Sequence, residues 1–307
     1  MRRHSFRLTA VLLSVLILSL ALVSCDSSVS DKGKLHILAM GDNFGSGIVS
    51  TLKTCENDAV ATAEILIKRA TEAGVTVGES HLLLGEEDTS ETKGATAANF
   101  GTALNKIKDA ASVNDITVIY LSTHGNNDIK KKVNYSDSNS KNTYFVLEDG
   151  SKGITFDDLL DFSNEIPGTI LIIADLCFSG AFIEQNNVTY NVNNYSGTNP
   201  VNILFSDAKV KESSKIYVLA ASSYFQESQA GSTVNDLSVF TDYMLKALGM
   251  SEFDGSVHYA SSIPSKKSNK ILLSDIYGYV YKETKKAGKA QVVQMSAGTN
   301  DLVLFSY

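Results

Sequence analysis

Residues 169–180 read TILIIADLCFSG, and this stretch decides the fold. Its first half is apolar on both faces of an extended chain, which is typical of a strand covered on both sides. A polar turn that carries Asp175 and Cys177 follows the strand directly. A second run of the same kind, DITVIYLS at 115–122, ends in a turn that carries His124. The two runs predict two buried strands of one mostly parallel sheet.

Outward from these runs, strand-like and helix-like segments alternate along the chain. Apolar residues recur at helical spacing in several of them, and Gly74 stands where a helix C-cap is expected. The alternation predicts an α/β fold with a mostly parallel sheet and helices on both of its faces. Further strands are expected at 34–40, 75–84, 215–221 and 292–305, a hairpin turning at Asp149 and Gly150 at 144–154, and helices at 55–73, 96–111, 156–162, 237–248 and 274–286.

The first 24 residues have the composition of an export signal. Several Arg residues precede an almost wholly apolar run at 8–23, and Cys25 follows a small residue. This pattern predicts a signal peptide at 1–24, and it is similar to a bacterial lipoprotein signal, in which the cysteine after the cleavage site is lipidated. The alternative is an ordinary signal peptide or an anchor helix, although the run is short for a stable span. Residues 25–33 are then a flexible tether, and we expect an exported, extracytoplasmic protein anchored to a membrane, with the leaflet left open.

Composition places the rest of the chain among ordinary globular proteins, with 43% hydrophobic and 20% charged residues. The net charge of −7 argues against general nucleic-acid binding. Once Cys25 is assigned to the lipid, Cys55 and Cys177 remain. They could form a disulfide, or one could be a reactive thiol with the other as its neighbour. No Cys/His cluster in the sequence has the spacing of a metal site.

His124 and Cys177 follow strands, and in open α/β sheets the functional site lies beyond the carboxyl ends of the strands. A thiol beside an imidazole is the chemistry of a cysteine peptidase, because the imidazole accepts the thiol proton and the thiolate attacks a carbonyl. The oxyanion that forms needs donors, for which the backbone N–H groups of Gly125 and Cys177 are candidates. Taken singly, such a histidine is more often structural and such a cysteine a small buried hydrophobe. Their separation of 53 residues favours the pair, because the His-to-Cys spacing in caspases is about 50.

Several motifs resemble those of metacaspases and related bacterial caspase-like peptidases. Asp-Leu-Cys-Phe-Ser-Gly at 175–180 is similar to the family's Asp-x-Cys-x-Ser-Gly around the nucleophile. Ser-Thr-His-Gly at 122–125 resembles its Ser-Gly-His-Gly, and Thr-Cys-Glu-Asn-Asp-Ala at 54–59 resembles its Gly-Cys-x-Asn-Asp-Ala, with Thr replacing Gly in both. The segment at 221–226 looks like the family's substrate-lining segment, and 239–241 looks like the start of its next helix.

The resemblance covers residues 34–307 and implies a three-layer αβα caspase-like fold with a sheet of about six strands. It divides this region into a large-subunit-like part at 34–185, a linker loop at 186–214 and a small-subunit-like part at 215–307. It also implies a cysteine endopeptidase that acts on proteins or peptides through a Cys–His dyad.

The resemblance further implies a specificity. The acidic S1 pocket of metacaspases, which receives a basic P1 side chain, corresponds here to Cys55, Asp58, Ser122 and Asp175. Two carboxylates around one concavity favour a cation between them, so we expect cleavage after Lys or Arg. The alternatives are an exposed first-turn carboxylate for Asp58 and a hydrogen bond to loop backbone for Asp175.

Calcium activation and self-cleavage are further expectations from the resemblance. Asp157, Asp158 and Glu184 lie roughly where some metacaspases hold calcium, although helix capping and solvation explain these acids more simply, and calcium needs six to eight oxygens. The chemistry itself requires no cofactor. Lys209 and Lys211 in the linker are the candidates for self-cleavage, and an uncut surface loop is the equal alternative.

Three function classes remain open from the sequence. The first is an active endopeptidase, which the presence of both reactive residues favours. The second is a catalytically silent binding module on the same fold, and the third is a transpeptidase or amidase that uses the same thiol. In an oxidising compartment, a Cys55–Cys177 disulfide could also hold the enzyme inactive, provided that the two Cα atoms lie within about 7 Å.

Overall fold

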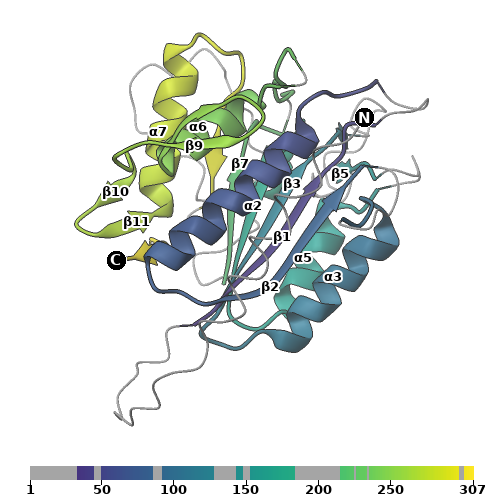
Figure 1. Ribbon diagram of the computed structural model, residues 1–307. Coiled ribbons are helices and arrows are strands. Elements are labelled where there is room, and N and C mark those ends of the chain that lie inside the picture. Colours follow the sequence, from purple (N-terminus) through teal and green to yellow (C-terminus); the bar gives the residue numbers. More distant parts are fainter. Residues whose placement is uncertain are drawn as a thin grey trace, which may run out of the picture. The chain divides into compact units, whose positions relative to one another are not determined.

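A six-stranded sheet lies at the centre of the fold (Figure 1). All neighbouring strands are parallel except the first pair, in which β12 runs antiparallel to β7. The structure thus confirms the predicted mostly parallel sheet. In spatial order the strands are β12 (Gln294–Met295), β7 (Ile216–Ala220), β6 (Thr169–Asp175), β3 (Ile116–Ser122), β1 (Leu35–Gly41) and β2 (Val77–Leu84).

The structure is a computed structural model, and it describes residues 33–44, 50–85, 92–127, 143–147, 153–183, 215–224, 226–233, 235–296 and 301–307. The stretch Gly33–Tyr307 forms one compact unit. Among the described residues, no helix combines the length and the apolar character needed to cross a membrane. The predicted signal peptide, with Cys25, lies outside the described residues.

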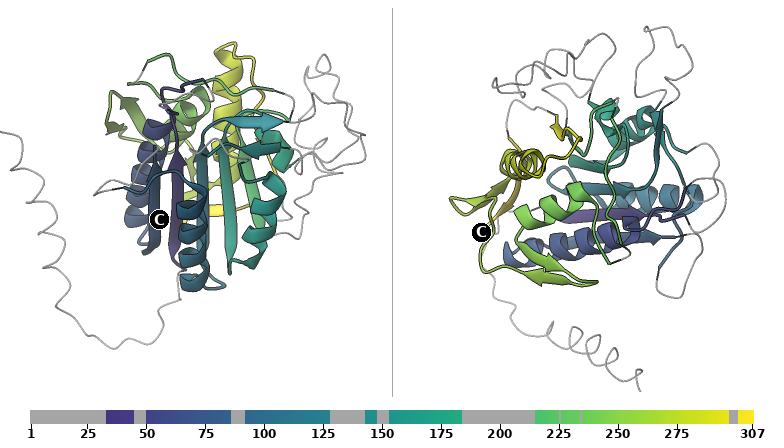
Figure 2. Two further views of the ribbon diagram at one scale, coloured as in Figure 1. Left: turned by 90° about the vertical axis from the view of Figure 1, so that its right-hand side faces the viewer. Right: turned by 90° about the horizontal axis from the view of Figure 1, so that it is seen from above.

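Helices cover both faces of the sheet (Figures 1 and 2). One apolar core joins the sheet to α2 (Cys55–Glu72), α6 (Val239–Ala247) and α7 (Leu273–Lys286). The other core joins it to α3 (Ala97–Ala110) and α5 (Phe156–Glu165). Side chains of a strand point alternately to its two faces, so each buried strand supplies both cores. This arrangement confirms the predicted three layers.

Local sequence explains where several helices begin and end. The Thr96 hydroxyl accepts the Asn99 N–H at the start of α3, and the Thr155 hydroxyl accepts the Asp158 N–H at the start of α5. Both are N-cap interactions, which satisfy backbone donors that the first helical turn leaves open. Gly74 follows α2 with φ +66°, a left-handed conformation that glycine adopts without steric cost.

The C-terminal segment differs from the single strand-like run expected at 292–305. It divides into β12, at the edge of the main sheet, and β13 (Val303–Ser306), which pairs with β11 (Lys270–Leu272) and through it with β10 (Lys266–Lys267). A hairpin of β8 (Met250–Phe253) and β9 (Val257–Tyr259) was not predicted. Short polar strands of this kind carry little periodicity, so their sequence does not distinguish them from loops.

The predicted hairpin at 144–154 is also altered. Its first strand, β5 (Thr143–Phe145), pairs with β4 (Gly125–Asn127), which directly follows His124. An antiparallel bridge between Tyr144 and Thr155 joins the two ends of the predicted hairpin. The predicted turn at 149–150 lies outside the described residues.

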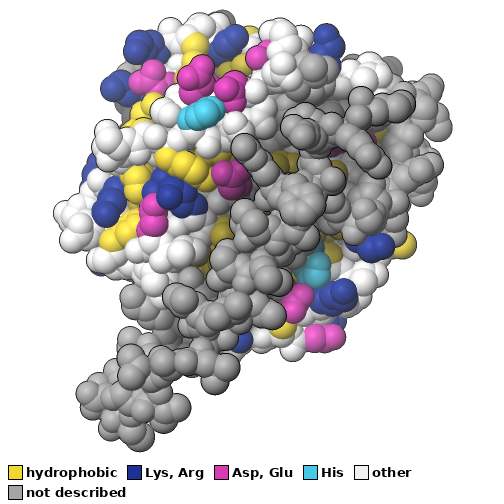
Figure 3. Space-filling view, viewed as in Figure 1, with side chains coloured by type: hydrophobic (Ala, Val, Ile, Leu, Met, Phe, Trp, Pro, Cys, Tyr) yellow, Lys and Arg dark blue, Asp and Glu magenta, His cyan; other side chains and the backbone are white. Residues whose placement is uncertain are grey.

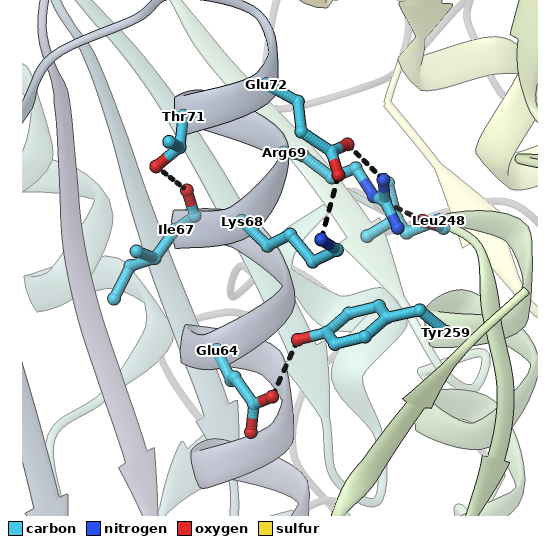
Figure 4. A network of polar contacts seen from close by, with 8 residues as sticks. All are labelled: Glu64, Ile67, Lys68, Arg69, Thr71, Glu72, Leu248 and Tyr259. Atoms are coloured by element: carbon cyan, nitrogen blue, oxygen red, sulfur yellow. Dashed lines mark hydrogen bonds and ion pairs between the residues drawn. The ribbon is translucent and has the colours of Figure 1, made fainter. Parts of the chain in front are cut away.

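Arg69 on α2 ties the first part of the domain to the last (Figure 4). Its side chain is buried, and its Nε–H donates to the Leu248 carbonyl at 2.8 Å. It also pairs with Glu72, and its guanidinium lies 5.7 Å from the ring centroid of Tyr259. The Tyr259 hydroxyl donates to Glu64 at 2.6 Å. These contacts join α2 to the end of α6 and to β9.

We expect Arg69→Met to lower the free energy of unfolding by about 2–3 kcal/mol, because it leaves the buried Leu248 carbonyl without its charged donor. Urea denaturation of both variants measures the effect. The control is Lys68→Met, which breaks an ion pair with Glu72 whose side chains are both 36% exposed, so the loss should stay below about 1 kcal/mol. Equal losses of unfolding free energy in the two variants would contradict the stabilising role of the buried hydrogen bond from Arg69 to Leu248.

Candidate active site

The turns after β3 and β6 meet at the carboxyl edge of the sheet. Ser122 and Asp175, the last residues of the two parallel strands, are register partners. A Cβ atom built on Gly125 would lie only 2.0 Å from the Cys177 carbonyl oxygen. The two backbones are therefore in direct contact, and glycine is the residue that permits this approach. The proximity of the His124 and Cys177 segments, which the sequence predicts, is confirmed.

The imidazole of His124 is hydrogen-bonded to the segment that follows β1. Its Nε2 lies 2.6 Å from the Ser50 carbonyl oxygen. Because a carbonyl only accepts hydrogen bonds, Nε2 must be the protonated nitrogen, which leaves the lone pair of the neutral ring on Nδ1. The Phe44 ring lies against the imidazole, with 5.2 Å between centroids. Neither neighbour could be predicted from the sequence, because neither belongs to a motif.

A tight turn after β1 places Phe44 beside His124. The Asp42 N–H donates to the Ser122 carbonyl at 3.1 Å, and the Asp42 carboxylate accepts the Phe44 N–H at 2.9 Å. Phe44 itself has φ +52°, a left-handed conformation that non-glycine residues rarely adopt. The Leu52 N–H donates to the Asn43 carbonyl at 2.8 Å, which brings the chain back toward Ser50.

The nucleophile candidate Cys177 lies in a turn bonded to the segment after β7. The Phe178 N–H donates to the Gln226 carbonyl at 2.8 Å, and Phe178 has φ +63°. The buried hydroxyls of Ser179 and Ser222 are 3.2 Å apart. Burial raises the pKa of the Cys177 thiol, while the Ser228 backbone N–H acts in the opposite direction. The thiol is thus mainly protonated at neutral pH and needs a base to become a nucleophile.

Asp58 is a fully buried carboxylate, so the alternative of an exposed first-turn residue is wrong. It accepts hydrogen bonds from the Ser122 hydroxyl at 2.9 Å, the Ser238 N–H at 2.8 Å and the Ser238 hydroxyl at 2.6 Å. Burial and, to a smaller extent, the charge of Asp175 together raise its pKa to about 8.

Asp175 is bonded to side chains from two later segments. It accepts hydrogen bonds from the Ser228 hydroxyl and the Thr241 hydroxyl, each at 2.7 Å. Burial raises its pKa to about 6. Thr241 in turn contacts the Tyr120 hydroxyl at 2.5 Å. The carboxylate is thus fixed by the segment after β7 and by α6, and the site depends on the part of the chain that follows the predicted linker.

The four predicted S1 residues lie together and are buried. The charges of Asp58 and Asp175 both act on the Cys55 thiol, and the Ser122 hydroxyl bonds to it. Cys55, Asp58, Ser122 and Asp175 are all at most 4% exposed. Hydroxyl groups donate hydrogen bonds to both carboxylates, which the sequence did not predict. Their charge can still act on a cation at the surface, because the interior screens little.

A cavity of about 310 Å³ lies elsewhere, at the first turns of α6. None of its lining residues was a predicted site residue. It is lined by Asp236, Leu237, Val239, Asp242, Tyr243, Phe253 and Lys289.

The structure describes two of the three predicted calcium ligands. Asp157 and Asp158 lie in the first turn of α5, where the Asp158 carboxylate accepts the Thr155 hydroxyl at 2.6 Å. Within the described ranges, no group of three or more His, Cys, Asp or Glu residues could hold a metal ion. Glu184, Lys209 and Lys211 lie outside the described residues.

Comparison with known proteins finds a family match over part of the chain and a similar fold. Residues 37–186 match the family model described as metacaspase, peptidase C14 domain. This segment includes both His124 and Cys177, and the match supports a relationship to caspase-like cysteine peptidases. None of the curated proteins compared matches the chain. The crystal structure of a protein from Geobacter sulfurreducens is similar at a TM-score of 0.55 and 20% identity, over 89% of this chain and 97% of that chain. That similarity supports the α/β fold alone.

The two thiols of the folded domain should differ in reactivity. Both are free, but Cys55 is buried and burial raises its pKa well above the ordinary value, whereas Cys177 is only half-buried. We expect iodoacetamide at pH 8 without reductant to label Cys177 and to spare Cys55, as read by peptide mass mapping. In denaturant both should react alike. Failure of both to react until reductant is added would instead indicate the Cys55–Cys177 disulfide.

Proposed function

We propose that this protein is a cysteine endopeptidase that hydrolyses peptide bonds after Lys or Arg, with Cys177 as the nucleophile and His124 as the base. The observation that carries the proposal is the contact between the two turns, in which Gly125 lies against the Cys177 backbone. The match to the metacaspase peptidase C14 family over the same segment supports it. This geometry favours a peptidase over a silent binding module, since a binding module needs neither a thiol nor an oriented imidazole.

The geometry supports a specific proton path. His124 Nε2 donates to the Ser50 carbonyl, so Nδ1 accepts the proton of the Cys177 thiol. The thiolate sulfur then forms a bond to the scissile carbonyl carbon, and the carbonyl oxygen becomes an oxyanion. The Nδ1–H of the imidazolium protonates the leaving amine as the C–N bond breaks, which leaves a thioester. Water, deprotonated by the same imidazole, hydrolyses the thioester and restores the thiol.

The oxyanion requires donors in place before the reaction begins. In our proposal the backbone N–H groups of Gly125 and Cys177 supply them. The close packing of these two residues supports this role, because it brings their backbones into direct contact.

Specificity for a basic P1 residue follows from the buried carboxylates. Asp175 and Asp58 lie below the nucleophile's turn among Ser and Thr hydroxyls. In the described part of the chain, no Lys or Arg side chain is bonded to either carboxylate. A Lys or Arg side chain of a substrate would supply the opposite charge, and an Asp side chain would be repelled.

The proposal places the enzyme outside the cytoplasm, attached to a membrane through a lipid on Cys25, where it meets protein and peptide substrates. Calcium as an activator, through Asp157, Asp158 and Glu184, and self-cleavage after Lys209 or Lys211 belong to the proposal as well. Activity with and without a calcium chelator tests the first, and N-terminal sequencing of active protein tests the second.

Fluorogenic peptides that differ only at P1 test the main claim. We expect release of the fluorophore after Arg and Lys, and none after Asp. An acyloxymethyl ketone with a P1 Lys should label Cys177. A silent binding module would give neither turnover nor labelling, and a transpeptidase would transfer the acyl group to an added amine in preference to water.

A further inference from the structure

The segment after β7 lies across the turn that carries the nucleophile. The Gln226 carbonyl accepts the N–H of Phe178, the residue after Cys177. The Ser228 hydroxyl donates to Asp175, two residues before Cys177, at 2.7 Å. Gln226 and Ser228 therefore bond to the two sides of the nucleophile, and Glu227 stands between them. These two hydrogen bonds fix the Glu227 backbone beside the Cys177 turn.

The Glu227 side chain is exposed, whereas Gln226 and Ser228 on either side of it are half-buried. Successive side chains of an extended segment alternate between its two faces, and the Ser228 hydroxyl is directed inward to Asp175. Glu227 is exposed, and its charge acts on the Cys177 thiol, whose pKa it raises. Charges of both signs are scattered over the described part of the face in Figure 3, so charge alone does not single out Glu227. Its fixed place beside the nucleophile does.

We infer that Glu227 forms a second acidic subsite, which selects a Lys or Arg side chain at P2, next to the P1 residue. This inference rests on the proposed function. In the described part of the chain, neither backbone polar group of Glu227 has a hydrogen-bond partner, so an extended peptide can pair with this residue. In an extended peptide, the P1 and P2 side chains point to opposite faces. If P1 is directed toward Asp175, on the face of Ser228, then P2 shares the face of Glu227.

The test compares two dipeptide substrates that have Arg at P1 and either Arg or citrulline at P2, each linked to a fluorophore. Citrulline has the shape of arginine without its charge, so the ratio of the two kcat/KM values reports charge recognition alone. We expect the wild-type protein to favour Arg at P2 by about three- to five-fold, the upper part of the range for an exposed ion pair. The ratio should fall with added salt. Chromatography verifies that cleavage occurs only at the fluorophore.

Glu227→Gln should reduce this ratio to about one, and Glu227→Lys should invert it; a ratio cancels any effect of the Glu227 charge on the Cys177 thiol that both substrates share. The control is Glu165→Gln, at the end of α5, where Glu165 is 61% exposed and pairs with Lys108; it should keep the wild-type ratio. An unchanged ratio in Glu227→Gln, or an equal fall in Glu165→Gln, would overturn the inference while P1 cleavage stands. Absence of cleavage of both substrates by the wild-type protein would overturn the proposed function, and this inference with it.

Discussion

Replacing Cys177 by alanine should abolish hydrolysis of Arg and Lys substrates, and replacing His124 by glutamine should lower kcat by about 10²–10⁴-fold. The first change removes the atom that forms the thioester. The second removes the base that a protonated thiol requires, since burial raises the pKa of Cys177. The double variant should be no slower than Cys177→Ala, because residues that act in one step are not additive.

Steady-state kinetics with a P1 Arg substrate measures both effects. The free energy of unfolding should change by less than about 1 kcal/mol in Cys177→Ala, since the thiol is only half-buried. The matched control is His258→Gln, which removes a His that pairs with Asp254 in the exposed β8–β9 connection and should leave kcat unchanged. Wild-type activity in either site variant would refute the dyad.

Binding of a basic P1 group should release protons near pH 7 and strengthen as pH rises from about 6 to 8. Burial raises the pKa of Asp175 to about 6 and that of Asp58 to about 8, so one or both carboxyls carry a proton in the free protein. A guanidinium nearby favours the charged forms and expels that proton. Calorimetric titration with benzamidine in two buffers of different ionisation enthalpy counts the protons released.

The same linkage fixes the sign of the pH dependence of stability. Both carboxyls hold protons more tightly when folded than their ordinary pKa allows when unfolded. Their contribution to the free energy of unfolding therefore falls as pH rises from about 4 to 8, and benzamidine should counteract the fall. Constant stability and constant affinity over this range would contradict the burial of two interacting carboxylates.

Asp175→Asn should lower kcat/KM for P1 Arg and Lys by about 100-fold, because it removes the charge that a basic side chain would meet. Neutral P1 substrates should lose far less. Asp161→Asn, an exposed change on α5, is the matched control and should leave the P1 preference unchanged. If Asp175→Asn failed to fold, the proton count in the wild-type protein would still decide the question.

Much of the fold could be predicted because its signals are local. The apolar runs at 115–122 and 169–174 are buried on both faces, and such strands need helices on either side. The order of strands and helices then placed the His124 and Cys177 turns at one edge, where the structure has them in contact. The polar strands β8 to β11 lacked any such periodicity and were missed.

The surroundings of the site could not be predicted in the same way. Ser50 and Phe44 follow β1 in the chain, and both contact the His124 imidazole. Ser238 reaches Asp58 over a separation of 180 residues. No periodicity or motif encodes such pairs, since any serine in a loop could be exposed. Only folding decides which hydroxyl a buried carboxylate bonds to.

The sequence by itself determined the sheet, its helices and the edge at which the His124 and Cys177 turns meet, because alternating burial and strand order are properties of neighbouring residues. The tertiary structure alone decided which nitrogen of His124 carries the proton, that both carboxylates are buried beneath hydroxyl donors, and that Glu227 stands beside the nucleophile. Those features depend on contacts between residues that are far apart in the sequence. Packing creates these contacts, and the local pattern of residues does not specify them.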